Sequence, residues 1–168
     1  MEKGLRILVV DDERAIRRFL RASLSTHGHT IYEAASGAEA LAVIAEQRPD
    51  MVFLDLGLPD ADGIAIIRQL REWSSVPVII LSVRDQENDK IQALDAGADD
   101  YLTKPFGIGE LMARMRGVLR RSMLAASGEP VIDRAGLHID FAHRLVTLSG
   151  VELSLTPTEY DILRVLVQ

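Results

Sequence analysis

Short apolar runs alternate with segments of helical periodicity along the first 121 residues, and this alternation limits the possible folds most strongly. The apolar runs are rich in β-branched residues and lie at 5–10, 30–34, 51–54, 78–81 and 98–102. Between them, apolar residues recur every three or four positions, which predicts helices at 14–27, 38–47, 64–73, 85–96 and 108–119. Five strands alternating with five helices predict an α/β fold, a flavodoxin-like, doubly wound parallel sheet with helices on both faces.

The composition and the spacing of apolar residues change after Arg121, which predicts a second region. Residues 122–130 are short, small and polar, with Gly128 and Pro130, and indicate a linker. Short antiparallel strands are then expected at 137–141, 145–148 and 151–155. A capping box starts a helix after them, with Thr156 at the N-cap, Pro157 at N1 and Glu159 at N3. We therefore expect domains at 1–121 and 131–168, joined by the linker.

The composition excludes several classes of protein. Of the 168 residues, 48% are hydrophobic and 26% are charged, which is typical of a globular protein. The absence of cysteine excludes disulfides and thiolate metal sites and favours the cytoplasm. No apolar run approaches the roughly 20 residues of a membrane span, so no membrane association is expected. The net charge of −6 argues against a surface devoted to nucleic acid.

Reactive side chains follow four of the predicted strands. Asp11 and Asp12 come after the first strand, Asp55 after the third, Ser82 closes the fourth, and Lys104 lies just beyond the fifth. In an open parallel sheet the carboxyl ends of the strands meet at one edge, where the crevice lies. Each residue alone has an ordinary explanation, such as a turn, a helix cap or a solvated charge. Their occurrence together at four strand ends favours a common site.

The chemistry of these side chains points to phosphoryl transfer assisted by Mg²⁺. Clustered carboxylates repel one another unless a cation lies among them, and a site with oxygen ligands alone suits Mg²⁺. Asp55 is the expected nucleophile, because it ends the central buried strand and its carboxylate can form an acyl phosphate. Lys104 and Ser82 can neutralise the remaining charge of the transferring group.

Four segments carry a resemblance to the receiver domain of two-component response regulators, which extends over residues 5–121. They are VVDDE at 9–13, LDLGLPDADG at 54–63, VIILS at 78–82 and GADDYLTKPFGIGEL at 97–111. The resemblance implies that a sensor histidine kinase phosphorylates Asp55. It also implies that Asp12, Asp55 and the carbonyl of Gly57 bind Mg²⁺, with Asp11 assisting through water. Further, Lys104 would contact the phosphoryl group beside a cis bond to Pro105, and Ser82 with Tyr101 would form the switch. Gly57 departs from the family pattern, where a bulkier residue is common, and this departure bears on the dephosphorylation rate.

Beyond the linker, the chain resembles the OmpR/PhoB-like subfamily, on residues 131–155 and on LTPTEYDILRVL at 155–166. The resemblance implies a winged-helix DNA-binding domain, of which this chain holds the opening part. Residues 122–168 contain three basic and six acidic residues, so we expect no specific DNA affinity of the fragment. A further resemblance, to a regulator of potassium-transport genes, rests on three segments: GLPDADG, REW at 71–73 and KPFGIGEL. In this subfamily the matching charged residues form a symmetric dimer on the face of the fourth helix, fifth strand and fifth helix, in the pairs Lys90–Glu110, Asp100–Arg114 and Asp95–Arg121.

Two other functions fit the sequence less well. A Mg²⁺-dependent phosphatase with an aspartate nucleophile carries that residue directly after the first strand in an Asp-x-Asp pattern, whereas Asp11 and Asp12 are adjacent and the central carboxylate is Asp55. A nucleotide- or flavin-binding domain needs a glycine-rich loop after the first strand, which this sequence lacks. The expected protein is therefore a self-catalysing phosphoacceptor with possible autophosphatase activity, and not an enzyme with a separate substrate.

Overall fold

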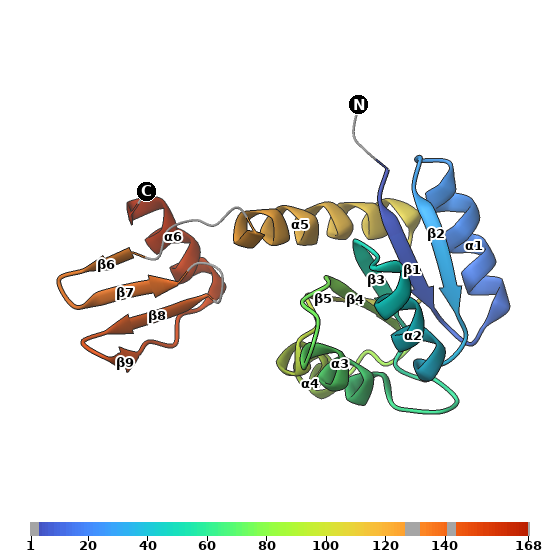
Figure 1. Ribbon diagram of the computed structural model, residues 1–168, viewed down its shortest axis with the longest axis horizontal. Coiled ribbons are helices and arrows are strands. Elements are labelled where there is room, and N and C mark those ends of the chain that lie inside the picture. Colours follow the sequence, from blue (N-terminus) through green and yellow to red (C-terminus); the bar gives the residue numbers. More distant parts are fainter. Residues whose placement is uncertain (1–3, 127–131, 141–143, 168) are drawn as a thin grey trace. The chain divides into compact units, whose positions relative to one another are not determined.

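The computed structural model of the chain describes residues 4–126, 132–140 and 144–167. The chain divides into two compact units, Met1–Leu119 and Arg120–Gln168. Each unit has its own sheet (Figure 1) and its own apolar core. In the described part of the chain, no helix combines the length and the apolar character that crossing a membrane requires.

The first unit is built on a five-stranded parallel sheet, as the sequence predicted. The strands run in the spatial order β2-β1-β3-β4-β5. Their bounds are Arg6–Val10 (β1), Thr30–Ala34 (β2), Met51–Leu54 (β3), Val78–Ser82 (β4) and Asp100–Thr103 (β5). The order reverses between β1 and β3, and the crevice of such a sheet lies at that reversal, beyond the carboxyl ends of the strands.

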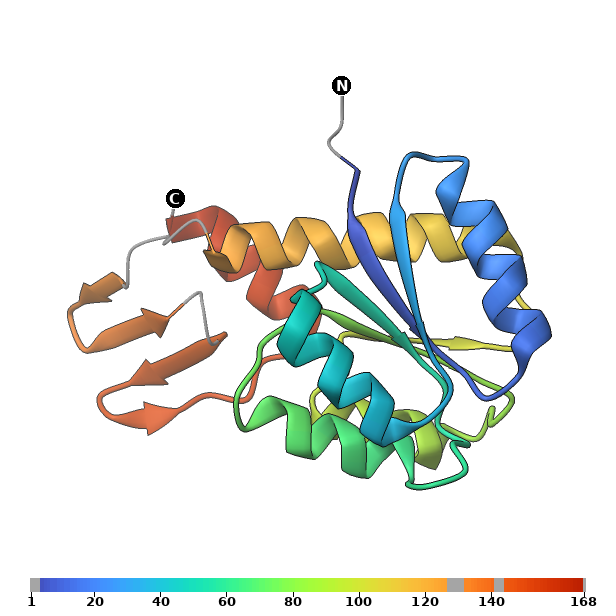
Figure 2. The same cartoon turned by 45° about the vertical axis from the view of Figure 1, so that its right-hand side comes forward.

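Helices cover both faces of this sheet (Figures 1 and 2). Their bounds are Arg14–Ser25 (α1), Gly37–Gln47 (α2), Gly63–Arg71 (α3), Glu87–Ala96 (α4) and Ile108–Ala126 (α5). Side chains of α1 and α5, such as Leu20 and Met115, pack on one face with Phe53 of β3. Side chains of α2, α3 and α4, such as Ile44, Ile67 and Ala93, form the core on the other face. The alternation of strand residues between these two cores explains why the strands are apolar on both sides.

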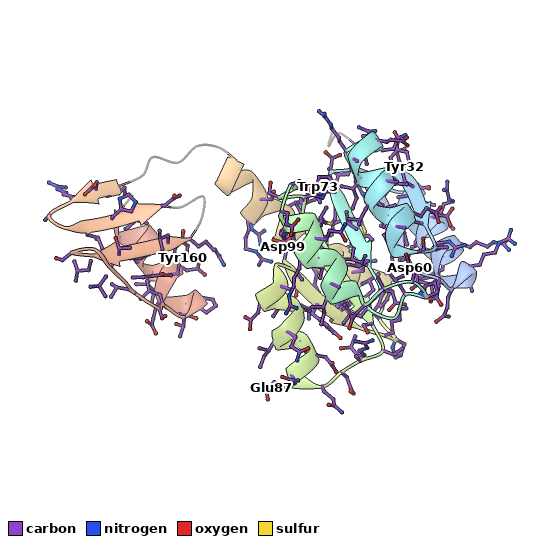
Figure 3. The ribbon with its side chains drawn as sticks, turned by 60° about the horizontal axis from the view of Figure 1, so that its bottom comes forward. Tyr32, Asp60, Trp73, Glu87, Asp99 and Tyr160 are labelled. Carbon is purple, nitrogen blue, oxygen red and sulfur yellow. The ribbon has the colours of Figure 1, made fainter. Side chains whose placement is uncertain are left out.

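Besides the last residues of α5, the described part of the second unit consists of a four-stranded antiparallel sheet and one helix. The elements are Ile132–Arg134 (β6), Leu137–Asp140 (β7), Leu145–Leu148 (β8), Val151–Glu152 (β9) and Pro157–Val167 (α6). Tyr160 of α6 packs against Ile139 and Val146 of the sheet, and Figure 3 shows the tyrosine within this unit. The amide of Glu159 donates to Thr156 Oγ1 at 3.3 Å, which confirms the predicted cap.

Several predicted boundaries need correction. Residues 122–126 continue α5 and do not form a linker, because Met123, Leu124 and the two alanines after them favour helix; residues 127–130 lie outside the described part of the chain. The strand expected at 151–155 ends at Glu152. The predicted strand residue Phe141 also lies outside the described residues.

The strand β6 was not among the strands predicted from the residue pattern, although it lies within the 131–155 segment of the resemblance. It joins β7 through Ala135 and Gly136, whose φ angles are 53° and 84°. Ser149 and Gly150 form the equivalent turn between β8 and β9, with φ angles of 52° and 83°. Turns of this kind need positive φ at both central residues, and an alanine seldom adopts it, so the Ala-Gly pair gave little sign of a hairpin.

Candidate functional site

Neighbouring strand ends bring three carboxylates together. β1 and β3 pair in register with Val10 beside Leu54, so the residues that follow them leave the sheet side by side. The amide of Asp55 donates to the carbonyl of Val10 at 2.9 Å, which fixes Asp55 next to Asp11. Possible ligand oxygens of Asp11, Asp12 and Asp55 all lie within 4.8 Å of one another. The convergence predicted from the strand ends is therefore present in the fold.

These carboxylates differ in burial, and this sets their electrostatics. Asp11 is 2% exposed and Asp55 is 8% exposed, whereas Asp12 is open to solvent. Burial is the main cause that raises the pKa of Asp55 above its ordinary value. The negative charges of Asp11 and Asp12 act in the same direction, while Lys104 and the amide of Gly57 oppose them. Negative charge on Asp55 is thus costly unless a cation shares the site.

The donor set fits a hard divalent cation. It offers carboxylate oxygens from three residues, with no sulfur and no imidazole in the cluster. Oxygen ligands on an open edge of the sheet leave room for water, which Mg²⁺ retains in most protein sites. The acidic cluster could therefore hold a metal ion.

Lys104 provides the positive charge of the site from the end of β5. Its Nζ lies 2.7 Å from Asp11 Oδ2 and 3.8 Å from Asp55 Oδ2, and the lysine side chain is only 9% exposed. The amide of Lys104 donates to the carbonyl of Ser82 at 2.8 Å, which ties the two strand ends together. The peptide bond between Lys104 and Pro105 is cis, as the resemblance implied.

Ser82 and Tyr101 are connected through the backbone of Arg84. The amide of Arg84 donates to Ser82 Oγ at 3.1 Å, and the Tyr101 hydroxyl donates to the Arg84 carbonyl at 2.6 Å. Burial is the main cause that raises the pKa of Tyr101, so its hydroxyl remains a donor. The guanidinium of Arg84 also lies 3.8 Å from Asp62, on the loop that follows Asp55. Arg84 was not predicted, since nothing in its local sequence shows that its backbone meets both residues.

Asp60 was also missed. Its carboxylate accepts hydrogen bonds from the amides of Gly37 and Ala38, at 2.8 and 3.0 Å, at the start of α2 (Figure 3). These amide bonds lower the pKa of Asp60. Asp60 therefore anchors the loop after Asp55 to a helix more than twenty positions away in the chain. Gly57, on the same loop, donates its amide to Asp55 Oδ1 at 3.4 Å.

The residues predicted for a dimer face lie on α4, β5 and α5, and some are paired within the chain. Arg114 contacts Asp100 at 3.1 Å and Glu110 at 3.3 Å. Lys90 lies over the ring of Tyr101, 5.9 Å from its centroid. Asp95 is on α4 and Arg121 on α5. The Asp100–Arg114 pair expected across a dimer thus exists inside one chain, and a dimer on this face would have to exchange it.

Comparison with known proteins places the chain among signalling proteins. Residues 7–116 match the family described as the response regulator receiver domain. The KDP operon transcriptional regulatory protein KdpE of Escherichia coli K12 is 51% identical over 161 residues, which are 96% of this chain and 72% of that protein. Response regulator MprA of Mycobacterium ulcerans is 45% identical over 168 residues, covering 98% of this chain and 72% of MprA. Among solved structures, the receiver domain of the Francisella response regulator 1452 is 38% identical with a TM-score of 0.67, covering 71% of this chain and 99% of that one.

Proposed function

Because this chain belongs to the response regulator receiver family, we propose that Asp55 accepts a phosphoryl group from a sensor histidine kinase. The chain is a two-component response regulator, and its KdpE relatives connect it to transcriptional regulation. The observation that carries the proposal is the position of Asp55 at the end of the central strand, with Asp11, Asp12 and Lys104 around it.

In the proposed reaction, one carboxylate oxygen of Asp55 attacks the phosphorus of the donor. A phosphorus–oxygen bond forms as the phosphorus–nitrogen bond to the kinase imidazole breaks, and the imidazole keeps the bonding electrons and takes up a proton. Asp11, Asp12, Asp55 and the Gly57 carbonyl would hold Mg²⁺, which supplies positive charge opposite the phosphoryl oxygens.

Lys104 carries the second part of the charge stabilisation. Its ammonium already lies within 3.8 Å of the Asp55 carboxylate, so a phosphoryl oxygen added there falls within reach of a charge-assisted hydrogen bond. The hydroxyl of Ser82 accepts from the Arg84 amide, and its own hydrogen, which interacts with the Tyr101 hydroxyl, would turn to a second phosphoryl oxygen. Autophosphatase activity at this acyl phosphate belongs to the same proposal.

We further propose that phosphorylation favours a homodimer on the face of α4, β5 and α5. The hydroxyls of Ser82 and Tyr101 both form hydrogen bonds with the backbone of Arg84, so a change in the Ser82 contact would alter the position of Tyr101, whose ring lies beside Lys90. The expected pairs are Lys90–Glu110, Asp100–Arg114 and Asp95–Arg121. Arg114→Glu should abolish phosphorylation-dependent dimerisation in sedimentation experiments, and unchanged dimerisation would rule out this face.

The remaining parts of the proposal concern cell biology and DNA. We propose a cytoplasmic protein that controls transcription, with potassium-transport genes as the expected targets from the KdpE likeness. The 168-residue chain is expected to lack specific DNA affinity. Tight, sequence-specific binding in an anisotropy titration would contradict this last point.

Incubation with acetyl phosphate and Mg²⁺, followed by intact mass measurement, tests the central proposal. The chain should gain one phosphoryl group, and chelation of Mg²⁺ or the Asp55→Asn substitution should prevent the gain. A gain that persists in Asp55→Asn would show that another residue is the acceptor.

A further inference from the structure

A groove lined by arginines lies beside the start of α1, on residues that the phosphoacceptor site does not use. Its volume is about 530 Å³. Three arginines at helical spacings of three and four form one side, and the turn between β2 and α2 forms the other; the lining residues include Arg14, Arg17, Arg18, Glu33 and Glu39. Residues so spaced share one face of a helix, so their positive charges are neighbours.

Both glutamates of the groove are already engaged. Glu33 lies 3.4 Å from Arg17 and 2.7 Å from Arg21, and Glu39 accepts a hydrogen bond from the Ala35 amide at 3.1 Å. Over the described residues, by contrast, neither Arg14 nor Arg18 forms an ion pair. The groove therefore keeps two unneutralised guanidinium groups four positions apart, in a chain whose net charge is −6.

The lining defines the chemistry of a suitable ligand. A guanidinium presents a planar fork of donors that matches two phosphate oxygens. The groove has the volume of a small-molecule site, yet none of its lining residues is aromatic or a large aliphatic. Such a lining suits an anion rich in phosphate oxygens.

We propose that this groove binds a pyrophosphate group, either as the free anion or as part of a nucleoside diphosphate. Arg14 and Arg18 would supply the direct contacts. Arg17 connects the groove to the acidic cluster, because its Nη1 donates to the carbonyl of Asp11 at 2.7 Å. Binding in the groove uses no carboxylate of the cluster, so it goes beyond phosphorylation of Asp55 and does not depend on it.

Isothermal titration of pyrophosphate into the full chain tests the proposal, in EDTA and at constant ionic strength. Saturable binding at one site is expected. The double substitution Arg14→Gln/Arg18→Gln should weaken it by about tenfold or more, since two charge-assisted contacts are lost. The matched control is Arg116→Gln/Arg120→Gln, which removes the same charge at the same spacing from exposed positions of α5 and should leave the affinity unchanged.

Three results would overturn the proposal: no binding at millimolar pyrophosphate, equal losses in both double variants, or binding that requires Mg²⁺. A parallel titration with ADP distinguishes the two sources of the pyrophosphate group. Equal affinity for both ligands supports an inorganic anion, and tighter binding of ADP supports a nucleotide. Asp55→Asn should bind pyrophosphate as the unmodified chain does, so a failure of the phosphoacceptor proposal would be seen separately.

Discussion

Replacing Lys104 with methionine should destabilise the receiver unit and increase its response to Mg²⁺. The ammonium lies 2.7 Å from Asp11 Oδ2, in a pair whose side chains are 9% and 2% exposed. At an effective dielectric constant of about 20, charges at that distance attract by about 6 kcal/mol before desolvation is subtracted. Breaking a buried pair by removing one partner costs about 3 kcal/mol net, because the other charge remains buried. For a unit of this size, that loss corresponds to a fall in Tm of about 10 °C in EDTA.

The Mg²⁺ response provides a second, independent measurement on the same variant. Lys104 and a divalent cation neutralise the same carboxylates, so Mg²⁺ should raise the Tm more in Lys104→Met than in the unmodified chain. Lys90→Met is the matched control, since the Lys90 ammonium lies 5.9 Å from the centroid of the Tyr101 ring and its loss should change stability by less than about 1 kcal/mol. Equal Tm values in EDTA for Lys104→Met and the unmodified chain, or equal Mg²⁺ responses, would refute this description of the site.

Three further substitutions test other parts of the structure, each by urea unfolding. Burial raises the pKa of Asp55, so the ionised carboxyl opposes folding at neutral pH and this cost disappears once the carboxyl is protonated. Asp55→Asn should therefore be more stable than the unmodified chain at neutral pH and lose that advantage in acid. A stability difference that stays constant across pH would contradict this prediction. The pKa of Asp60 is lowered instead, so Asp60→Ala should be destabilising at neutral pH, and the difference should disappear as the pH falls through the folded pKa. Gly97→Ala should cost roughly 1–3 kcal/mol, since φ is +118° and a Cβ would lie 2.8 Å from Arg71 Cγ, whereas Gly109→Ala in the open first turn of α5 should be neutral or stabilising.

The strand ends were predictable because their signal is local. A buried strand that terminates in a carboxylate can be read from a few residues, as at Asp11 and Asp55. Parallel pairing then brings such ends together whatever the intervening sequence is. The position of Lys104 followed from the same rule, and its contact with Asp11 agrees with it.

The contacts that were missed join residues far apart in the sequence through backbone atoms. Asp60 caps α2 across more than twenty positions, and the backbone of Arg84 meets the side chain of Tyr101 seventeen positions away. A backbone donor or acceptor is the same for every residue type, so the sequence carries no sign of which one is used. The hydrogen bonds from Arg71 to the Gly97 carbonyl, at 2.9 and 3.0 Å, escaped notice for the same reason.

The end of α5 was predicted too early, for a different reason. Gly128 and Pro130 indicated a break after residue 121, but the residues immediately after 121 have good helix propensity and α5 runs on to Ala126. Glycine and proline show where a helix cannot continue, but they do not show how far before them it ends.

The most direct test of the account is to locate the phosphoryl group among the three clustered carboxylates. Borohydride reduction converts an aspartyl phosphate to homoserine, and peptide mass spectrometry then identifies the position. After treatment with acetyl phosphate and Mg²⁺, homoserine is expected at position 55 and not at 11 or 12. Homoserine at either of those positions, or none at all in a chain that has gained phosphoryl mass, would contradict the assignment of Asp55 as the phosphoacceptor.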